Sequence, residues 1–437
     1  MADTDLKALG AFYESELFGS IMPFWMSRAL DPVNGGYFTC FNNRGDRLLY
    51  RHKFTWSQGR FVWTLARLNR SFKGRRPQRE TEEYLAQARR GAEFLMKHAR
   101  LPNGNCAFIL SEEGRPVLLD TQGNPRAADP NEFYDSSVFA DLFVVYGLAE
   151  YVMAANDRRS YQFAVELYES ACERLRQPVF RSDPYPVPAG YETHGRPMIL
   201  VETAHEMAQA AECLGDSRKN QFLAQAEESM NEVMGKFRDP ATNLITEMYS
   251  TDTEKCGTML GQYVNPGHTL ECMWFICHLA RRLGARKRIE QAIRVIKAAC
   301  KTGWDEKYGG FFQFTHRSGG APRGPVPPEL ENAEMIRKLR ENWDNKLWWP
   351  HSEALYTLLL GHVLSQDKEL LDWYWRVHEY AFRTFPNLDH QVGEWIQIRT
   401  RDGTPVDKVV ALPVKDPFHI TRAFIFCTEL LREVKPE

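Results

Sequence analysis

The spacing of the apolar residues is the feature that most constrains the fold of this chain. Apolar side chains recur at three- and four-residue intervals in about twelve segments, a spacing typical of helices with a buried face. Short stretches rich in glycine and aromatic residues separate these segments, and long alternating strands are not apparent. The predicted helices cover residues 5–29, 52–73, 80–100, 132–156, 158–176, 197–214, 217–236, 266–284, 286–302, 345–364, 367–384 and 417–434.

A weak internal repeat lies between some of these helices. The sequence DPVNGGYF at residues 31–38 recurs as DEKYGGFF at 305–312 and, more loosely, as DHQVGEWI at 389–396. Each copy follows a predicted helix, carries glycine four residues after the aspartate and ends in a β-like apolar pair. Glycine readily adopts the positive φ that such a turn requires.

Helical hairpins joined by recurring turns favour a closed array. Twelve helices taken as six hairpins predict an all-α fold, an (α/α)6 barrel with short β-like turn segments, and an irregular helical bundle is the alternative. No Pro/Ser-rich linker divides the chain, so we expect residues 1–437 to form a single catalytic domain. Residues 316–344 open with Gly, Pro and Arg and continue as a charged, helix-like stretch, which we interpret as a mobile loop insertion near one barrel mouth.

The composition argues against several classes of partner. Lys and Arg number 55 against 57 Asp and Glu, a balance that disfavours a nucleic-acid-binding protein with a broad basic face. No secretory signal and no run of 18 apolar residues are visible, so we expect no membrane span. The nine cysteines are scattered and form no CxxC pair, which favours reduced thiols and a cytoplasmic location.

The motifs of several enzyme classes are missing. The sequence contains no GxxxxGK[ST], no GxGxxG opening a helix, no GxSxG and no HExxH. A phosphate-cradling nucleotide enzyme, a serine hydrolase of the elbow type and a zincin are therefore poorly supported, and we expect no metal.

Ionisable side chains interrupt aromatic or apolar runs at the starts of several predicted helices. Any one of them could be a satisfied core residue, because buried histidines and arginines usually have partners. In a closed barrel, however, the starts of the inner helices converge on one mouth, where polar groups and flat rings could bind a sugar. The candidates are Trp56, Arg60, His268, Glu271, Trp349, Glu353 and His419.

The segments that hold these residues resemble those of the N-acylglucosamine 2-epimerase family, which includes cellobiose 2-epimerases and aldose–ketose isomerases of mannose-type sugars. The resemblance covers nearly the whole chain. It rests on WSQGR (56–60), GAEFLMKHAR, CAFIL and GRPV within 91–117, NPGHTLE (265–271), GWD…GGFF (303–312), KLWWPHSEA (346–354) and FHITR (418–422).

The resemblance implies an (α/α)6 barrel and proton transfer at the carbon beside the carbonyl of an opened sugar. It makes His268 and His419 the two proton-transfer residues of a reaction through an enediolate. Which histidine removes the proton is left open. The resemblance further implies that Glu271 and Glu353 orient the histidines or bind hydroxyls. Arg60 would then bind the oxyanion and Trp349 would stack on the sugar, with Trp56 also lining the pocket.

One departure from the family bears on the substrate. Cellobiose and mannose-isomerising members carry a further histidine where this chain has RPMILVE (196–202), a pattern more like the N-acylglucosamine branch. We therefore expect a 2-epimerase of N-acyl-D-glucosamine and N-acyl-D-mannosamine. A D-mannose/D-glucose or cellobiose 2-epimerase and an aldose–ketose isomerase are alternatives. No cofactor is expected, although ATP could act as an allosteric activator, and the family suggests a homodimer.

Two readings from outside the family are also open. A glycoside hydrolase with this fold would use Glu271 and Glu353 as its carboxylate pair, and it would release monosaccharide from oligosaccharides. A non-catalytic helical protein could instead bind a partner through its amphipathic outer helices. That second reading gives no role to the ionisable groups at the helix starts.

Overall fold

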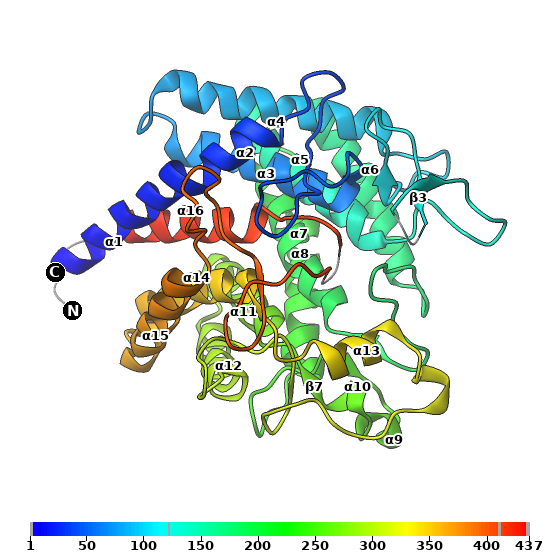
Figure 1. Cartoon of the computed structure of the whole chain (residues 1–437), viewed down its shortest axis with the longest axis vertical. Helices are drawn as coiled ribbons and strands as arrows, with labels where there is room; N and C mark the ends of the chain where they lie inside the picture. Colours follow the sequence, from blue (N-terminus) through cyan, green and yellow to red (C-terminus); the bar gives the residue numbers. More distant parts are fainter. Residues whose placement is uncertain (1–2, 121–122, 410–411, 434–437) are drawn as a thin grey trace.

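The computed structural model describes residues 3–120, 123–409 and 412–433. Six helices form a closed inner ring in which each packs against the next, and the last packs against the first (Figure 1). In ring order they are α3 (Thr55–Phe72), α5 (Val138–Ala155), α7 (Gly195–Leu214), α11 (Pro266–Leu283), α14 (Trp348–Ser365) and α16 (Phe418–Glu433).

Six further helices cover the outside of this ring, and each packs mainly on one inner helix. They are α1 (Asp3–Glu16), α4 (Gln78–His98), α6 (Arg158–Leu175), α8 (Lys219–Glu232), α12 (Arg286–Gly303) and α15 (Lys368–Thr384). A π-helical turn, η1 (Leu17–Ile21), continues α1 into α2 (Met22–Arg28), and η2 (Val233–Phe237) extends α8. The prediction of an (α/α)6 barrel is confirmed.

The position of α5 in the ring explains its sequence. By length and composition this helix could cross a membrane, but most of it is buried inside the fold. An inner helix contacts neighbours on nearly every side, so it is apolar all round rather than amphipathic. Its two charged residues are paired with arginines, Asp141 with Arg174 and Glu150 with Arg70 at 2.6 Å between Nη1 and Oε1.

The helix bounds agree with the predicted segments except at a few places. Residues 132–137, predicted as the start of a helix, are not helical, because Ser137 is extended at φ −146° and its backbone pairs with Ser182. The short helices α9 (Thr253–Cys256) and α10 (Met259–Gln262) were not predicted, since four residues carry too little periodicity to detect. Residue 434 of the last predicted segment lies outside the described residues.

The predicted turn is present in all three copies. The backbone N–H groups of Gly35, Gly309 and Gly393 donate to the carbonyls of the aspartates four residues earlier, with φ values of +80°, +76° and +74°. A fourth copy begins at Asp239, where Asn243 adopts φ +60° in place of glycine. The prediction missed this copy because it searched for glycine, although asparagine also tolerates the left-handed region.

Two-residue strands fix where four of the inner helices begin. β1 (Lys53–Phe54), β5 (Glu192–Thr193), β7 (Tyr263–Val264) and β9 (Lys346–Leu347) each end within two residues of an inner helix. They pair antiparallel with β2 (Ile109–Leu110), β6 (Met248–Tyr249), β8 (Thr315–His316) and β10 (Ile398–Arg399) respectively. One further pair, β3 (Leu118–Leu119) with β4 (Pro125–Arg126), lies between α4 and α5.

The insertion predicted at 316–344 holds the 3-10 turn η3 (Pro328–Leu330) and the helix α13 (Glu334–Glu341). Met335, Ile336 and Leu339 of α13 are buried in an apolar cluster with Tyr263 and Phe314, separate from the main core. The charged helix-like stretch is thus a packed helix. Its mobility stays a prediction.

Candidate active site

First-turn side chains of all six inner helices line one cavity of about 250 Å³. Its size suits a small ligand, since pockets for drug-sized molecules begin at roughly 300 Å³. Six of the seven predicted site residues line it: Trp56, Arg60, His268, Glu271, Trp349 and His419. The seventh, Glu353, is fully buried and hydrogen-bonds His419.

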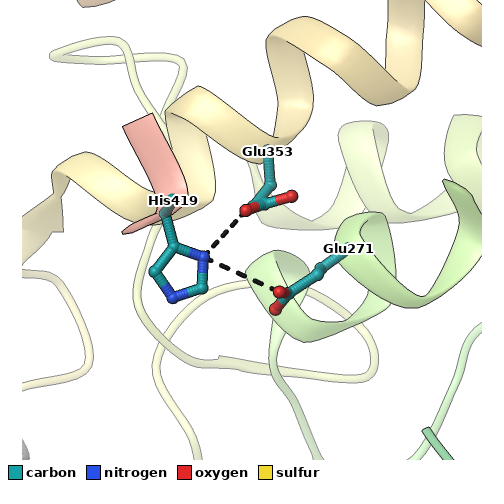
Figure 2. A group of neighbouring side chains, drawn as sticks. All are labelled: Glu271, Glu353 and His419. Carbon is teal, nitrogen blue, oxygen red and sulfur yellow. Dashed lines mark hydrogen bonds and ion pairs between the residues drawn. The ribbon is translucent and has the colours of Figure 1, made fainter. Parts of the chain in front are cut away.

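Two buried carboxylates contact the imidazole of His419 (Figure 2). The Nδ1 atom of His419 lies 2.7 Å from Oε1 of Glu353 and 3.6 Å from Oε1 of Glu271. The Arg422 guanidinium binds both carboxylates through Nη2, at 2.6 Å from Oε1 of Glu353. The indole of Trp274 donates to the second oxygen of Glu353 at 2.7 Å.

These contacts keep Glu353 ionised. Burial alone would raise its pKa, but the guanidinium of Arg422 and the hydrogen bond from His419 lower the pKa to about 2. Glu271, Glu353 and His419 lie close enough together to hold a cation. The Arg422 guanidinium already binds both carboxylates, so this donor set fits an internal ion pair better than a metal site.

A second buried carboxylate supports His268. Glu247 accepts from Nδ1 of His268 at 3.1 Å through Oε2, and its Oε1 lies 3.3 Å from Nδ1 of the buried His194. The backbone of His268 is held as well, because its N–H donates to the side chain of Asn265, the N-cap of α11.

This arrangement favours the protonated form of His268. Burial would lower its pKa, but the Glu247 carboxylate outweighs burial, and the pKa lies above its ordinary value. Glu247 itself would be raised by burial, yet its contacts with His268 and His194 lower the pKa to about 2. Each cavity histidine therefore presents Nδ1 to a buried carboxylate, which leaves Nε2 for a ligand.

Trp349 contacts both of these histidines. Its ring centroid lies 5.4 Å from that of His268 and 5.3 Å from that of His419, with tilts of 40° and 37°. Gly267 makes room for the indole, because a Cβ there would lie 2.5 Å from its outer ring atoms. The same indole therefore packs against both imidazoles.

Arg60, on α3, also lines the cavity. Its guanidinium is ion-paired with Asp416 and stacks within 4.2 to 5.0 Å of the rings of Phe143, Trp56 and Phe418. Burial lowers its pKa, and Asp416 opposes that effect. An arginine in such surroundings stays charged and can stabilise an anion.

Sequence reasoning missed four residues of this site: His194, Glu247, Asp416 and Arg422. Arg422 lies within a segment used for the resemblance, three residues after His419 and therefore on the same helical face. Glu247 is the eighth residue after Asp239, so recognising the Asn-containing turn would have pointed to it. Asp416 precedes α16 and caps Phe418 at 2.6 Å, a signal visible as Asp two residues before a helix.

The arrangement of these side chains is suited to proton transfer. Two histidines held by buried carboxylates can act as the base and the acid of a proton transfer. A guanidinium close by can balance the negative charge that forms when a carbon acid loses its proton.

Comparison with known proteins agrees with this geometry. Residues 36–423 match the family model for N-acylglucosamine 2-epimerase. The chain is 30% identical to the N-acylglucosamine 2-epimerase of Mus musculus over 94% of this chain and 89% of that protein. It is 29% identical to the Homo sapiens protein of the same name, over 94% and 87%. The cellobiose 2-epimerase of Bacillus thermoamylovorans superposes with a TM-score of 0.75 at 18% identity, over 98% of this chain and all of the other, which shows a similar fold.

Proposed function

Because the chain belongs to the N-acylglucosamine 2-epimerase family, we propose that it interconverts N-acyl-D-glucosamine and N-acyl-D-mannosamine without a cofactor. The observation that carries the proposal is the pair of cavity histidines, each backed by a buried carboxylate and both in contact with Trp349. A 2-epimerase needs two such groups, because a proton leaves one face of C2 and returns to the other.

The reaction begins with the open-chain aldehyde of the sugar. One histidine takes the C2 proton through Nε2, the C–H electron pair forms the C1–C2 double bond, and the carbonyl electrons move to O1. The resulting enolate takes a proton at C2 from the other histidine on the opposite face, which restores the aldehyde with inverted configuration. Each histidine is base in one direction and acid in the other.

The charged groups of the site have separate tasks in this scheme. Arg60 stabilises the negative charge on O1. Glu353 and Glu247 hold the imidazoles and stabilise them when protonated, and Glu271 binds a sugar hydroxyl from the cavity wall. Trp349 and Trp56 offer flat surfaces to the sugar carbons.

The identity of the atom that receives the proton separates an epimerase from the related isomerases. A proton returned to C2 gives the epimer, whereas a proton delivered to C1 gives a ketose. An N-acyl group on C2 favours the first outcome, because the amide nitrogen stays on that carbon.

The test is proton NMR of N-acetyl-D-mannosamine incubated with the enzyme in D2O. We expect the C2 signal to exchange and N-acetyl-D-glucosamine to accumulate. His268→Ala or His419→Ala should abolish epimerisation while circular dichroism stays that of the wild type. Full epimerisation by either variant, or failure of the wild type to form N-acetyl-D-glucosamine, would overturn the proposal.

A further inference from the structure

The cavity has an apolar wall on the side of His268, and the proton-transfer scheme gives it no role. Met248, Phe314 and Met335 line the cavity and belong to the apolar cluster that is separate from the main core. Met248 directly follows Glu247, the partner of His268, so this wall adjoins that histidine. Met335 comes from α13, the helix within the insertion at 316–344.

The position of α13 is fixed by more than its apolar face. Lys338 is buried, and its ammonium lies 4.1 Å from the ring centroid of Tyr185, another residue of the cavity wall. Lys338 also lies 3.4 Å from Glu334 one turn earlier. The helix is thus anchored to the cavity rim, and Met335 is held in the wall.

A buried amide, Gln313, adjoins the same wall. It lines the cavity next to Phe314 and is 3% exposed, and its carbonyl oxygen has no hydrogen-bond partner among the described residues. Buried polar atoms are usually satisfied, so an exception beside a cavity indicates a group that a ligand completes. The side-chain amide has one accepting and one donating end, which rotation about its last bond can exchange.

Comparison of the repeated turns shows how residues at the position of Gln313 are bonded in the other copies. Gln313, Glu247 and Gln397 each stand eight residues after the aspartate of their own turn. Glu247 is bound by two histidines, and Gln397 both donates to and accepts from the backbone of Asp416. Thr39 and Gln313, at the same position of the two other copies, each have a side-chain oxygen without a hydrogen-bond partner among the described residues, and of these two residues only Gln313 lines the cavity.

We propose that Gln313 and the wall of Met248, Phe314 and Met335 form the subsite for the N-acyl group of the substrate. Gln313 hydrogen-bonds the secondary amide, and the three apolar side chains enclose the acyl methyl. The inference rests on the proposed function, since the acyl group is attached to the carbon that loses its proton beside His268. A neutral amide with a short apolar tail matches a primary amide next to an apolar wall, whereas a free hydroxyl at C2 would leave that wall in contact with water.

The experiment compares kcat/KM for C2 exchange on N-acetyl-D-mannosamine and on D-mannose. Gln313→Met keeps the side-chain volume and removes the amide, so the N-acetyl to mannose ratio should fall about tenfold or more. Met335→Ala enlarges the subsite, so the rate on N-butanoyl-D-mannosamine relative to the N-acetyl sugar should rise about tenfold.

Met259→Ala is the matched control, because Met259 belongs to the same cluster and is as buried as Met335 but does not line the cavity. It should lower the melting temperature without changing either ratio. If Gln313→Met does not fold, Gln313→Asn withdraws the amide by one methylene and should lower the same ratio.

The outcomes separate this inference from the proposed function. If the wild type does not epimerise N-acetyl-D-mannosamine, the proposed function fails. If the wild type does so and both ratios stay unchanged in the Gln313 and Met335 variants, the function stands and the acyl subsite is overturned.

Discussion

The carboxylate of Glu247 lies 3.1 Å from Nδ1 of His268, and Glu247 is buried whereas the His268 side chain is 38% exposed. The same carboxylate also binds His194, so two imidazoles share one negative charge. The second cavity histidine shares Glu353 with a guanidinium instead. Each cavity histidine thus has a buried carboxylate at Nδ1, but the second partner of that carboxylate is an imidazole at Glu247 and a guanidinium at Glu353.

Glu247→Gln should remove the negative charge beside His268 while keeping the hydrogen bond that positions its imidazole. The amide oxygen can still accept from Nδ1, but the charge that raises the pKa of His268 is gone. We expect kcat to fall at least about tenfold, and the limb of the pH–rate profile that reports His268 to move to lower pH. Glu227→Gln, a change at an exposed site, should leave the profile as it was. An unchanged limb in Glu247→Gln would contradict this account.

Arg422→Met should destabilise the protein strongly. It leaves the carboxylates of Glu353 and Glu271 buried without their shared cation, and breaking such a pair costs about 3–5 kcal/mol. Urea unfolding measures the loss. Adding Glu353→Gln to Arg422→Met should recover part of it, because one uncompensated charge is removed. Strictly additive losses would show that the two residues act independently.

The stability of the protein should fall in acid because of Glu247 and Glu353. Both carboxyls have a pKa of about 2 in the folded state, below the ordinary value of 4.5. Their ionised forms therefore stabilise the fold above the ordinary pKa, and this stabilisation is lost as the pH falls from about 5 to 2. The free energy of unfolding, measured by urea titration across that range, should decline less steeply in Glu247→Gln. An equally steep decline would show that protonation of Glu247 does not cause the loss of stability in acid.

Gly267→Ala should disturb both histidines through Trp349. Alanine usually stabilises a helix relative to glycine, but here its Cβ would lie 2.5 Å from the indole, so the ring must move. Since displacements of about 1 Å can cost roughly 100-fold in rate, we expect a loss of that order in kcat/KM. Gly19→Ala is the control and should keep full activity, because its Cβ would meet no atom of the described residues within 4 Å. Equal activities in the two variants would show that Trp349 does not position the two histidines.

The barrel could be predicted from the sequence because the apolar residues of its helices recur at regular intervals. Inner and outer helices differ in how much of their surface is apolar, and this difference can be read along the chain without knowing any contact. The start of α5 was placed too early because the polar and aromatic residues at 132–137 fit a helical pattern, while their backbone pairs with a distant segment. Such pairing has no local signature.

The site was predicted only in part for a related reason. Trp56, Arg60, His268, Glu271, Trp349, Glu353 and His419 lie within motifs long enough to be recognised. Glu247 and Gln313 lie in the short bends that precede β6 and β8, and the importance of Glu247 comes from its contacts with histidines at the starts of two inner helices. Their repeated spacing from an aspartate was present in the sequence, but one copy uses asparagine at the turn and so escaped a search for glycine.

The closure of the ring by α16 has a consequence for synthesis of the protein. This helix carries His419 and Arg422, and it binds the earliest described helix, where Arg432 pairs with Glu14 at 2.8 Å (Figure 1). A growing chain on the ribosome that has not yet reached α16 therefore has the other five inner helices but neither a closed ring nor His419, which we propose as the second proton-transfer residue. A product that stops before residue 418 would lack α16, so the ring would stay open between α14 and α3 and expose apolar surface.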